Sequence, residues 1–196
     1  MGLYRHRMAL LSERFDRAVA MAAELHRAQV RKGTTIPYLS HLLAVTALVL
    51  EHGGEEDDAI AAMLHDAAED QGGLETLARI RSGFGDGVAG LVAAVSDSFA
   101  DVKPPWRERK ERYLAHLAEA DPRAVRLSLA DKLHNARCTL ADVRLLGADT
   151  WARFKGGRDG TLWYLRGVLD VARSRGLHPA LASQLDETVG ALESAS

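Results

Sequence analysis

Residues 59–70 read AIAAMLHDAAED, an apolar run that ends in four ionisable side chains. On a helix, His65 lies one turn from Glu69. Asp66 lies one turn from Asp70 in the same way, so an imidazole and three carboxylates project from neighbouring turns of one side. Carboxylates crowded in a partly dry place repel one another and are costly to desolvate. A divalent cation would remove this conflict, so the stretch predicts a metal site on a helix.

The same helical spacing of apolar residues continues through most of the chain. It occurs in residues 15–25, 42–49 and 60–64, whereas the alternation typical of a half-buried strand is nowhere sustained. Glycine- and proline-containing breaks divide the chain into about eight to ten helices with mostly short connections. These breaks lie at 33–37, 53–54, 72–73, 83–87, 104–105, 156–157 and 179. We therefore expect an all-α helical bundle.

Capping side chains predict where three of the helices begin. The expected caps are Ser40, Asp57 and the pair Asp121-Pro122, each just before a segment that carries a candidate metal ligand. Metal ligands on helices are held more rigidly than ligands on loops. The longest irregular stretch, residues 96–105, is expected to form a loop near the site, where such loops often close over substrate.

The length and charge of the chain restrict the class of protein. Its 196 residues suit one domain, and 27 acidic against 25 basic residues give a net charge of −2. This balance argues against a broad electrostatic contact with nucleic acid or an anionic membrane. No stretch reaches the roughly 20 apolar residues of a membrane span. The single cysteine, Cys138, excludes an internal disulfide and fits a reducing compartment, so we expect a cytoplasmic protein.

Two more candidate ligands come from other segments of the chain. His41 lies upstream and Asp131 downstream of His65-Asp66, and ligands from three helical segments suit an interior site in a bundle. An isolated histidine at a helix start is usually a cap or a solvated residue, but ionisable groups inside apolar helices need partners. Two imidazoles and two carboxylates favour one manganese ion over zinc, iron or magnesium. Open positions would remain for water and a phosphate oxygen.

Three motifs in this order resemble the HD superfamily of metal-dependent phosphohydrolases. They read RKGTTIPYLSH at 31–41, HDAAED at 65–70 and LADKLHNAR at 129–137. Within the superfamily they are similar to the hydrolase domain of the bacterial RelA/SpoT proteins, and more so to the stand-alone small alarmone hydrolases, including their animal relative. The similarity covers residues 15–175, and it implies a single HD domain over residues 1–196. It also implies removal of pyrophosphate from the 3′ position of guanosine tetraphosphate or pentaphosphate, with manganese.

The resemblance assigns roles to the ionisable residues of the motifs. Its metal ligands match His41, His65, Asp66 and Asp131, and its catalytic acidic pair matches Glu69 and Asp70. The helical spacing fits this division, because carboxylates one turn beyond the ligands stand close enough to accept a proton from water at the ion. The alternative is that the acidic pair only orients the ligands or the ion.

Basic and amide side chains near the motifs are the candidates for binding the nucleotide. They are Arg31, Lys32, Lys103, Arg109, Arg112, Asn135 and Arg158. The resemblance places the first two and the asparagine near the nucleotide, while the others are assigned to the distal phosphates as a cluster around the long loop and a later segment. For each basic residue alone, an ordinary surface charge is the alternative.

Three further residues are expected to be structural. His134 is interpreted as a satisfied, half-buried histidine, with a donor to a metal ligand as the alternative. Trp163 and Tyr164 are interpreted as core aromatics, since aromatic residues at helical spacing usually are, with a wall near the base of the nucleotide as the alternative.

Departures from the family pattern affect substrate preference more than chemistry. Leu42 stands where the long enzymes usually have proline, loop 33–36 is one residue longer than theirs, and Cys138 replaces a common threonine. No synthetase domain follows the motifs before Ser196, so a hydrolase without synthetase activity is expected.

Several alternative functions stay open at this point. The substrate could be an adenosine counterpart of the alarmones, or the 2′-phosphate of NADPH. The protein could instead be the antitoxin partner of a toxic alarmone synthetase, or a nucleotide sensor without turnover. The complete ligand set and the pair Glu69-Asp70 argue against the sensor, because binding alone needs no carboxylate to activate water. A homodimer is possible.

Overall fold

Helices form the whole regular structure of the part of the chain that can be described. The computed structural model describes residues 11–98 and 104–195, and within these ranges it contains ten α-helices and one 3₁₀ helix. The β pairing in these ranges is one isolated antiparallel bridge between Val30 and Pro37. The all-α fold expected from the spacing of apolar residues is confirmed.

Most of the predicted breaks lie at or beside helix boundaries. The elements are α1 (Glu13–Leu25), α2 (Leu39–Glu51), α3 (Glu56–Leu64), α4 (Ala67–Asp70), α5 (Gly73–Phe84), α6 (Asp86–Val95), α7 (Trp106–Glu119), α8 (Pro122–Leu146), η1 (Gly147–Arg153), α9 (Gly157–Ser174) and α10 (Pro179–Ser194). Two boundaries were not expected, the one between α3 and α4 and the one between α8 and η1. Among the described helices, none is both long enough and apolar enough to cross a lipid bilayer.

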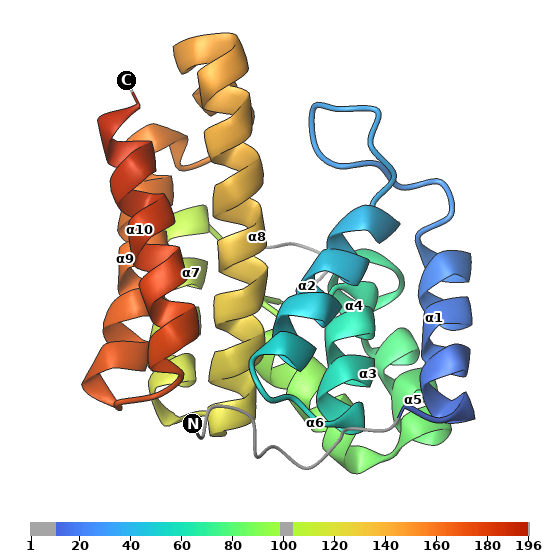
Figure 1. The fold of residues 1–196 in the computed structure, drawn as a ribbon. Coiled ribbons are helices and arrows are strands. Elements are labelled where there is room, and N and C mark those ends of the chain that lie inside the picture. Colours follow the sequence, from blue (N-terminus) through green and yellow to red (C-terminus); the bar gives the residue numbers. More distant parts are fainter. Residues whose placement is uncertain (1–10, 99–103, 196) are drawn as a thin grey trace, which may run out of the picture.

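Helix α8 is the central element of the bundle. In Figure 1 it stands between the earlier helices α1–α6 and the group formed by α7, α9 and α10. Its residues are buried almost continuously from Ala124 to Asp131, which is typical of a helix covered on more than one face. The middle of α8 therefore lies in the interior, where it can carry a buried functional side chain.

One of the three predicted helix starts is correct. Asp121 caps α8 by accepting a hydrogen bond from the amide of Arg123, and Pro122 takes the first helical position. Ser40 is wrong as a cap, because α2 begins one residue earlier, at Leu39, and has no side-chain cap. Asp57 is also wrong as a cap.

Helix α3 begins two residues earlier than expected, because Asp58 reaches back along the chain. Its carboxylate accepts a hydrogen bond from the amide of Glu55 at 2.8 Å, which makes Glu55 the capping residue. The same buried carboxylate also receives Arg123 Nε at 2.6 Å and Arg126 Nη1 at 3.1 Å, both from α8. Asp58 thus joins α3 to α8, the helices next to the candidate ligands.

Glycine lets α7 and α9 approach closely. A Cβ atom at Gly167 would lie 2.5 Å from Leu114 Cδ1, and one at Gly156 would lie 2.7 Å from the ring of Trp106. Neither distance is compatible with an unshifted neighbour, so a side chain at either position would displace Leu114 or Trp106. The close approach brings Tyr113 of α7 and Tyr164 of α9 to a ring centroid distance of 5.9 Å.

We expect Asp58→Ala to lower the free energy of unfolding by about 2 to 4 kcal/mol, because it leaves two arginines and an amide without their buried acceptor. Denaturant unfolding measures the change. Asp57→Ala is the matched control, since its carboxylate is more exposed and pairs at the surface with Arg14, and it should cost less than about 1 kcal/mol. Equal losses in the two variants would contradict this role of Asp58.

Candidate metal and hydrolytic site

The stretch that carries most of the candidate site is not one continuous helix. Helix α3 ends at Leu64, His65 and Asp66 form a turn, and the short helix α4 follows. The imidazole of His65 bonds at 2.8 Å to the carbonyl of Ala62, which would accept the amide of Asp66 if α3 continued. The one-turn relation expected between Asp66 and Asp70 is present, because the amide of Asp70 donates to the carbonyl of Asp66 at 2.9 Å.

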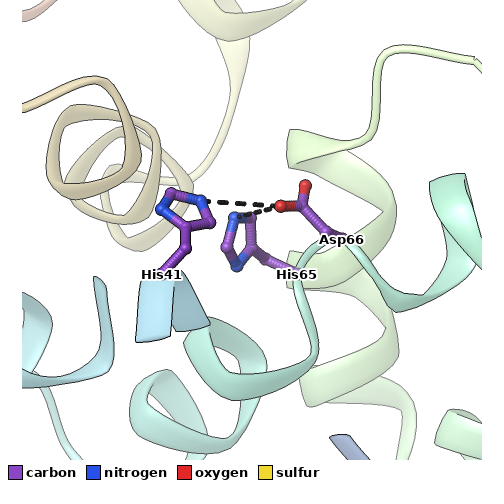
Figure 2. A group of neighbouring side chains, drawn as sticks. All are labelled: His41, His65 and Asp66. Atoms are coloured by element: carbon purple, nitrogen blue, oxygen red, sulfur yellow. Dashed lines mark ion pairs between the residues drawn. The ribbon is translucent and has the colours of Figure 1, made fainter. Parts of the chain in front are cut away.

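Three candidate ligands meet at the end of α3 with an arrangement that can hold a metal ion. Figure 2 shows both imidazoles directed at one carboxylate oxygen, with His41 Nε2 3.6 Å and His65 Nε2 3.0 Å from Asp66 Oδ2. The ligand atoms of the three residues all lie within 4.8 Å of one another. Both Nε2 atoms are buried without a hydrogen-bond partner. Since buried polar atoms nearly always have a partner, these two nitrogens fit a bound cation.

Asp131 brings the fourth candidate ligand from the middle of α8. Its Oδ1 atom lies 3.2 Å from His41 Nε2 and 3.9 Å from His65 Nε2. Its carboxylate also accepts hydrogen bonds from the ammonium of Lys132 and the amide of Asn135. The four residues expected from the sequence therefore converge from α2, the turn after α3, and α8.

The other ring nitrogens leave both Nε2 atoms available as ligands. His65 Nδ1 faces a carbonyl, so it must carry the proton and donate it. His41 Nδ1 lies 2.7 Å from His134 Nδ1. Burial and the neighbouring His41 lower the pKa of His134 to about 4, so its neutral ring can accept a proton donated by His41. His134 thus contacts a candidate ligand, but as an acceptor and not as the donor that the sequence analysis gave as the alternative.

The acidic and imidazole groups stabilise one another's charged forms. Burial alone would raise the pKa of the Asp66 carboxyl, but His65 and His41 hold it well below its ordinary value. The pKa of the Asp131 carboxyl is likewise held down, in spite of burial, by Lys132 and the two imidazoles. Burial alone would lower the pKa of His65, and the two carboxylates raise it to about 9. A bound divalent cation would replace the His65 proton as the positive charge that stabilises the two carboxylates.

The candidate ligands open onto a cavity of about 190 Å³. Five carboxylates line it, from Asp66, Glu69, Asp70, Asp97 and Asp131. The other lining residues are Tyr38, Val95, Lys110, Tyr113, Lys132, Asn135 and Tyr164. The expected acidic pair thus shares one small space with two of the candidate ligands. Tyr38, which the sequence analysis did not single out, donates from its hydroxyl to Asp66 Oδ2 at 2.6 Å.

Each member of the acidic pair has a partner that orients it. Glu69 Oε2 accepts the amide of Asp97 at 2.9 Å, and Asp70 Oδ2 accepts Gln29 Nε2 at 2.8 Å. The side-chain oxygen of Gln29, Oε1, in turn accepts a hydrogen bond from Gln71 Nε2 at 2.6 Å. Burial and the nearby Asp66 raise the pKa of Asp70. Gln29 was missed because a glutamine in a loop carries no signal until the fold places it beside a carboxylate.

Two of the candidate nucleotide contacts lie beside the metal ligands. Arg31 Nη2 donates to Asn135 Oδ1 at 2.6 Å, and Asn135 in turn donates to Asp131. Asn135 also lines the cavity. Lys32 is exposed in the same loop as Arg31. The loop before α2 and the middle of α8 therefore meet at one edge of the site.

The remaining basic candidates do not line the cavity in the described part of the chain. Arg109 is buried, and it pairs with the Asp97 carboxylate and the carbonyl of Pro104. Arg112 is exposed and pairs with Glu108 at 3.4 Å. Arg158 donates to the carbonyl of Glu193 at 2.9 Å. Lys103 lies outside the described residues.

Two lysines line the cavity instead, and neither was singled out from the sequence. Lys110 follows Arg109 on α7, and Lys132 follows Asp131 on α8. Of the two aromatic candidates, Tyr164 lines the cavity. Trp163 instead packs under the guanidinium of Arg107, which lies 3.3 Å from its ring centroid. Adjacent positions on a helix point in different directions, which spacing along the chain alone could not resolve.

The comparison with known protein families agrees with this geometry. A sequence model described as the HD domain matches residues 18–162. The chain belongs to the HD domain family. Within that family it is related to the MESH1 and SpoT proteins. Guanosine-3′,5′-bis(diphosphate) 3′-pyrophosphohydrolase MESH1 of Xenopus tropicalis is 36% identical over 165 residues, which cover 78% of this HD domain protein and 89% of that relative.

Other relatives extend the match in sequence and structure. MESH1 of Drosophila melanogaster is 31% identical, with 90% of this chain and 93% of its own covered. A GTP pyrophosphokinase of Streptomyces coelicolor is 38% identical over 125 residues, but these are only 14% of its length. A solved metazoan orthologue of SpoT that hydrolyses ppGpp superimposes with a TM-score of 0.76 at 29% identity, over 92% of this chain and 96% of its own.

We expect Mn²⁺ to raise the thermal unfolding midpoint of the wild-type protein, because a ligand that binds only the folded state stabilises it. His65→Ala removes a candidate ligand and should abolish most of this rise. His116→Ala is the control, since His116 is an exposed histidine on α7. Equal stabilisation of all three proteins, measured by differential scanning fluorimetry, would contradict the metal site.

We also expect the affinity for Mn²⁺ to depend on pH. His65 binds a cation only without its Nε2 proton, and its pKa in the metal-free protein is about 9. Protons therefore compete with the metal below this pH, and the dissociation constant should rise about tenfold for each pH unit lowered. Calorimetric titrations at several pH values measure it. An affinity that does not change below pH 9 would exclude His65 as a ligand.

Proposed function

We propose that this HD domain protein hydrolyses the 3′-diphosphate of guanosine tetraphosphate and pentaphosphate, with one manganese ion as cofactor. The products are pyrophosphate and GDP or GTP. The observation that carries the proposal is the single cavity in which two candidate metal ligands and the pair Glu69 and Asp70 face one another. The relatives named as 3′-pyrophosphohydrolases, which the chain covers almost completely, support the choice of reaction and substrate.

The four candidate ligands His41, His65, Asp66 and Asp131 would hold the ion. Their two imidazoles and two carboxylates fit manganese, and the unpartnered Nε2 atoms support a cation between them. A bound divalent ion polarises a phosphoryl group and lowers the pKa of water. The side chains of the protein then have to position the substrate and accept a proton from the attacking water.

Glu69 and Asp70 are proposed to take the proton of the attacking water. The water oxygen forms a bond to the phosphorus attached to the ribose 3′ oxygen, and the bond between that phosphorus and the 3′ oxygen breaks. One proton passes to the carboxylate pair, which returns it to the departing 3′ oxygen so that a hydroxyl forms. A raised pKa makes Asp70 a better proton acceptor than an ordinary carboxylate, and Gln29 keeps it oriented.

Arg31, Lys32 and Asn135 are proposed to contact the nucleotide. Arg31 and Asn135 are hydrogen-bonded to each other at the edge of the site, and Lys32 follows Arg31 in an exposed loop. A guanidinium and an amide suit phosphate and ribose oxygens. This placement would bring the nucleotide in beside Asp131, with its 3′ side toward the cavity.

A panel of nucleotides tests the function directly. We expect pyrophosphate to be released from guanosine 3′-diphosphates with Mn²⁺, and the release to stop after chelation. The panel includes the adenosine 3′-diphosphates and NADPH, and release of orthophosphate is measured separately from release of pyrophosphate. If no 3′-diphosphate is hydrolysed while another member of the panel is, the proposed function is wrong.

Replacing the acidic pair tests the chemistry of the site. We expect Glu69→Gln and Asp70→Asn to lower kcat by about 10² to 10⁴, the usual contribution of general base catalysis, while the bound manganese is unchanged. Steady-state kinetics and metal analysis measure the two quantities. Glu75→Gln, an exposed residue of α5, is the control. A loss of manganese in place of turnover would mean that the pair only orients the ligands.

A further inference from the structure

One part of the cavity wall is basic and aromatic. Lys110 Nζ lies 4.7 Å from the ring centroid of Tyr164 and 6.0 Å from that of Tyr113. Lys132 Nζ lies 5.5 Å and 5.4 Å from the same two centroids. The rings meet edge to face, so two ammonium groups flank one pair of tyrosines. All four residues line the cavity that holds the acidic pair.

The two ammonium groups are not fully balanced by the carboxylates beside them. Lys110 pairs with Asp97 at 3.0 Å, but the same carboxylate also pairs with Arg109. Lys132 pairs with Asp131, which is a candidate metal ligand. Burial and the charge of Lys132 lower the pKa of Lys110 to about 8. An anion between the two lysines would offset the repulsion between their positive charges.

Among the described residues, the buried hydroxyl of Tyr164 has no acceptor. Tyr164 is 7% exposed, and its hydroxyl oxygen is buried without a hydrogen-bond partner. Lys132 interacts with the Tyr164 side chain, but an ammonium can only donate, so it offers no acceptor for the hydroxyl hydrogen. The hydroxyl of the neighbouring Tyr113 is satisfied, because it donates to Ser128 at 2.8 Å. A buried donor without an acceptor is costly, so the wall is completed by an acceptor from a ligand.

We propose that Lys110, Lys132 and Tyr164 form a subsite that binds the two linked phosphates of a diphosphate. Two cations and a hydroxyl donor match several phosphate oxygens at once. The other charged residues among those that line the cavity are carboxylates, which repel phosphate, so this wall is where a diphosphate can lie. As the place where the substrate's 3′-diphosphate lies, the subsite rests on the proposed function. As a binding site for diphosphate it does not depend on turnover.

Binding of inorganic pyrophosphate to the manganese-loaded protein tests the subsite by calorimetry. We expect Tyr164→Phe to weaken binding about tenfold, the usual effect of removing one hydrogen bond to a charged group. Lys110→Met should weaken it further and affect inorganic phosphate less. Lys155→Met makes the same change at an exposed lysine outside the cavity and should bind as the wild type does. Equal manganese content shows that the metal site is unchanged.

The thermal midpoint separates a binding defect from a folding defect. Tyr164→Phe breaks no hydrogen bond that uses its hydroxyl hydrogen, so its midpoint without pyrophosphate should equal or exceed that of the wild type. The rise on adding pyrophosphate should be smaller than in the wild type. If both variants bind pyrophosphate with wild-type affinity, or if the wild-type protein does not bind it, the proposal is overturned.

Kinetics with a 3′-diphosphate nucleotide identify where the diphosphate comes from. If Lys110→Met raises KM, the subsite holds the esterified diphosphate of the substrate. If only product inhibition by pyrophosphate weakens, it holds the released diphosphate. Should the protein hydrolyse no nucleotide while the variants still lose pyrophosphate binding, the subsite stands and the proposed function fails. Should hydrolysis occur with all variants binding as the wild type does, only the subsite fails.

Discussion

The interior of this protein depends on keeping acidic and imidazole groups together in a place with little water. His41, His65, Asp66 and Asp131 are brought within a few ångströms by three separate segments of the chain. Such a cluster would be costly without compensation. Protonated His65 and Lys132 supply part of it in the metal-free protein, and a cation bound between the carboxylates and the two Nε2 atoms would supply the rest. The surrounding helices bring these acidic and imidazole groups together.

Helix α8 connects the candidate site to the rest of the bundle. It carries the adjacent residues Asp131 and Lys132 and, one turn later, Asn135, and it contacts helices from both halves of the chain. The ion pairs of Asp58 hold its first turns to the start of α3, whose other end carries His65. The candidate ligands and the groups that orient them are therefore carried by helices that are joined to one another. Rigid placement is what a site needs to present a preorganised set of ligands.

The charges of the cavity divide it into regions with different tasks. The carboxylates gather where a cation and a proton have to be held, and the basic groups stand on α7, α8 and the loop before α2. Membership in the HD domain family and similarity to MESH1 agree with the first region, since its residues lie in the matched part of the chain. In the second region, aromatic rings and a buried hydroxyl, in addition to charge, shape the cavity wall.

The sequence by itself determined the all-α class and the identity of the candidate ligands and acidic pair. Helical periodicity and glycine breaks are local signals, and ionisable residues within apolar helices stand out along the chain. Only the tertiary structure decided which cations reach the cavity. Arg109 and Lys110 are adjacent in the sequence, yet Arg109 forms a buried ion pair with Asp97 and does not line the cavity, whereas Lys110 does. The partners Gln29, Tyr38 and His134 were likewise decided by contacts between distant segments, which no local pattern encodes.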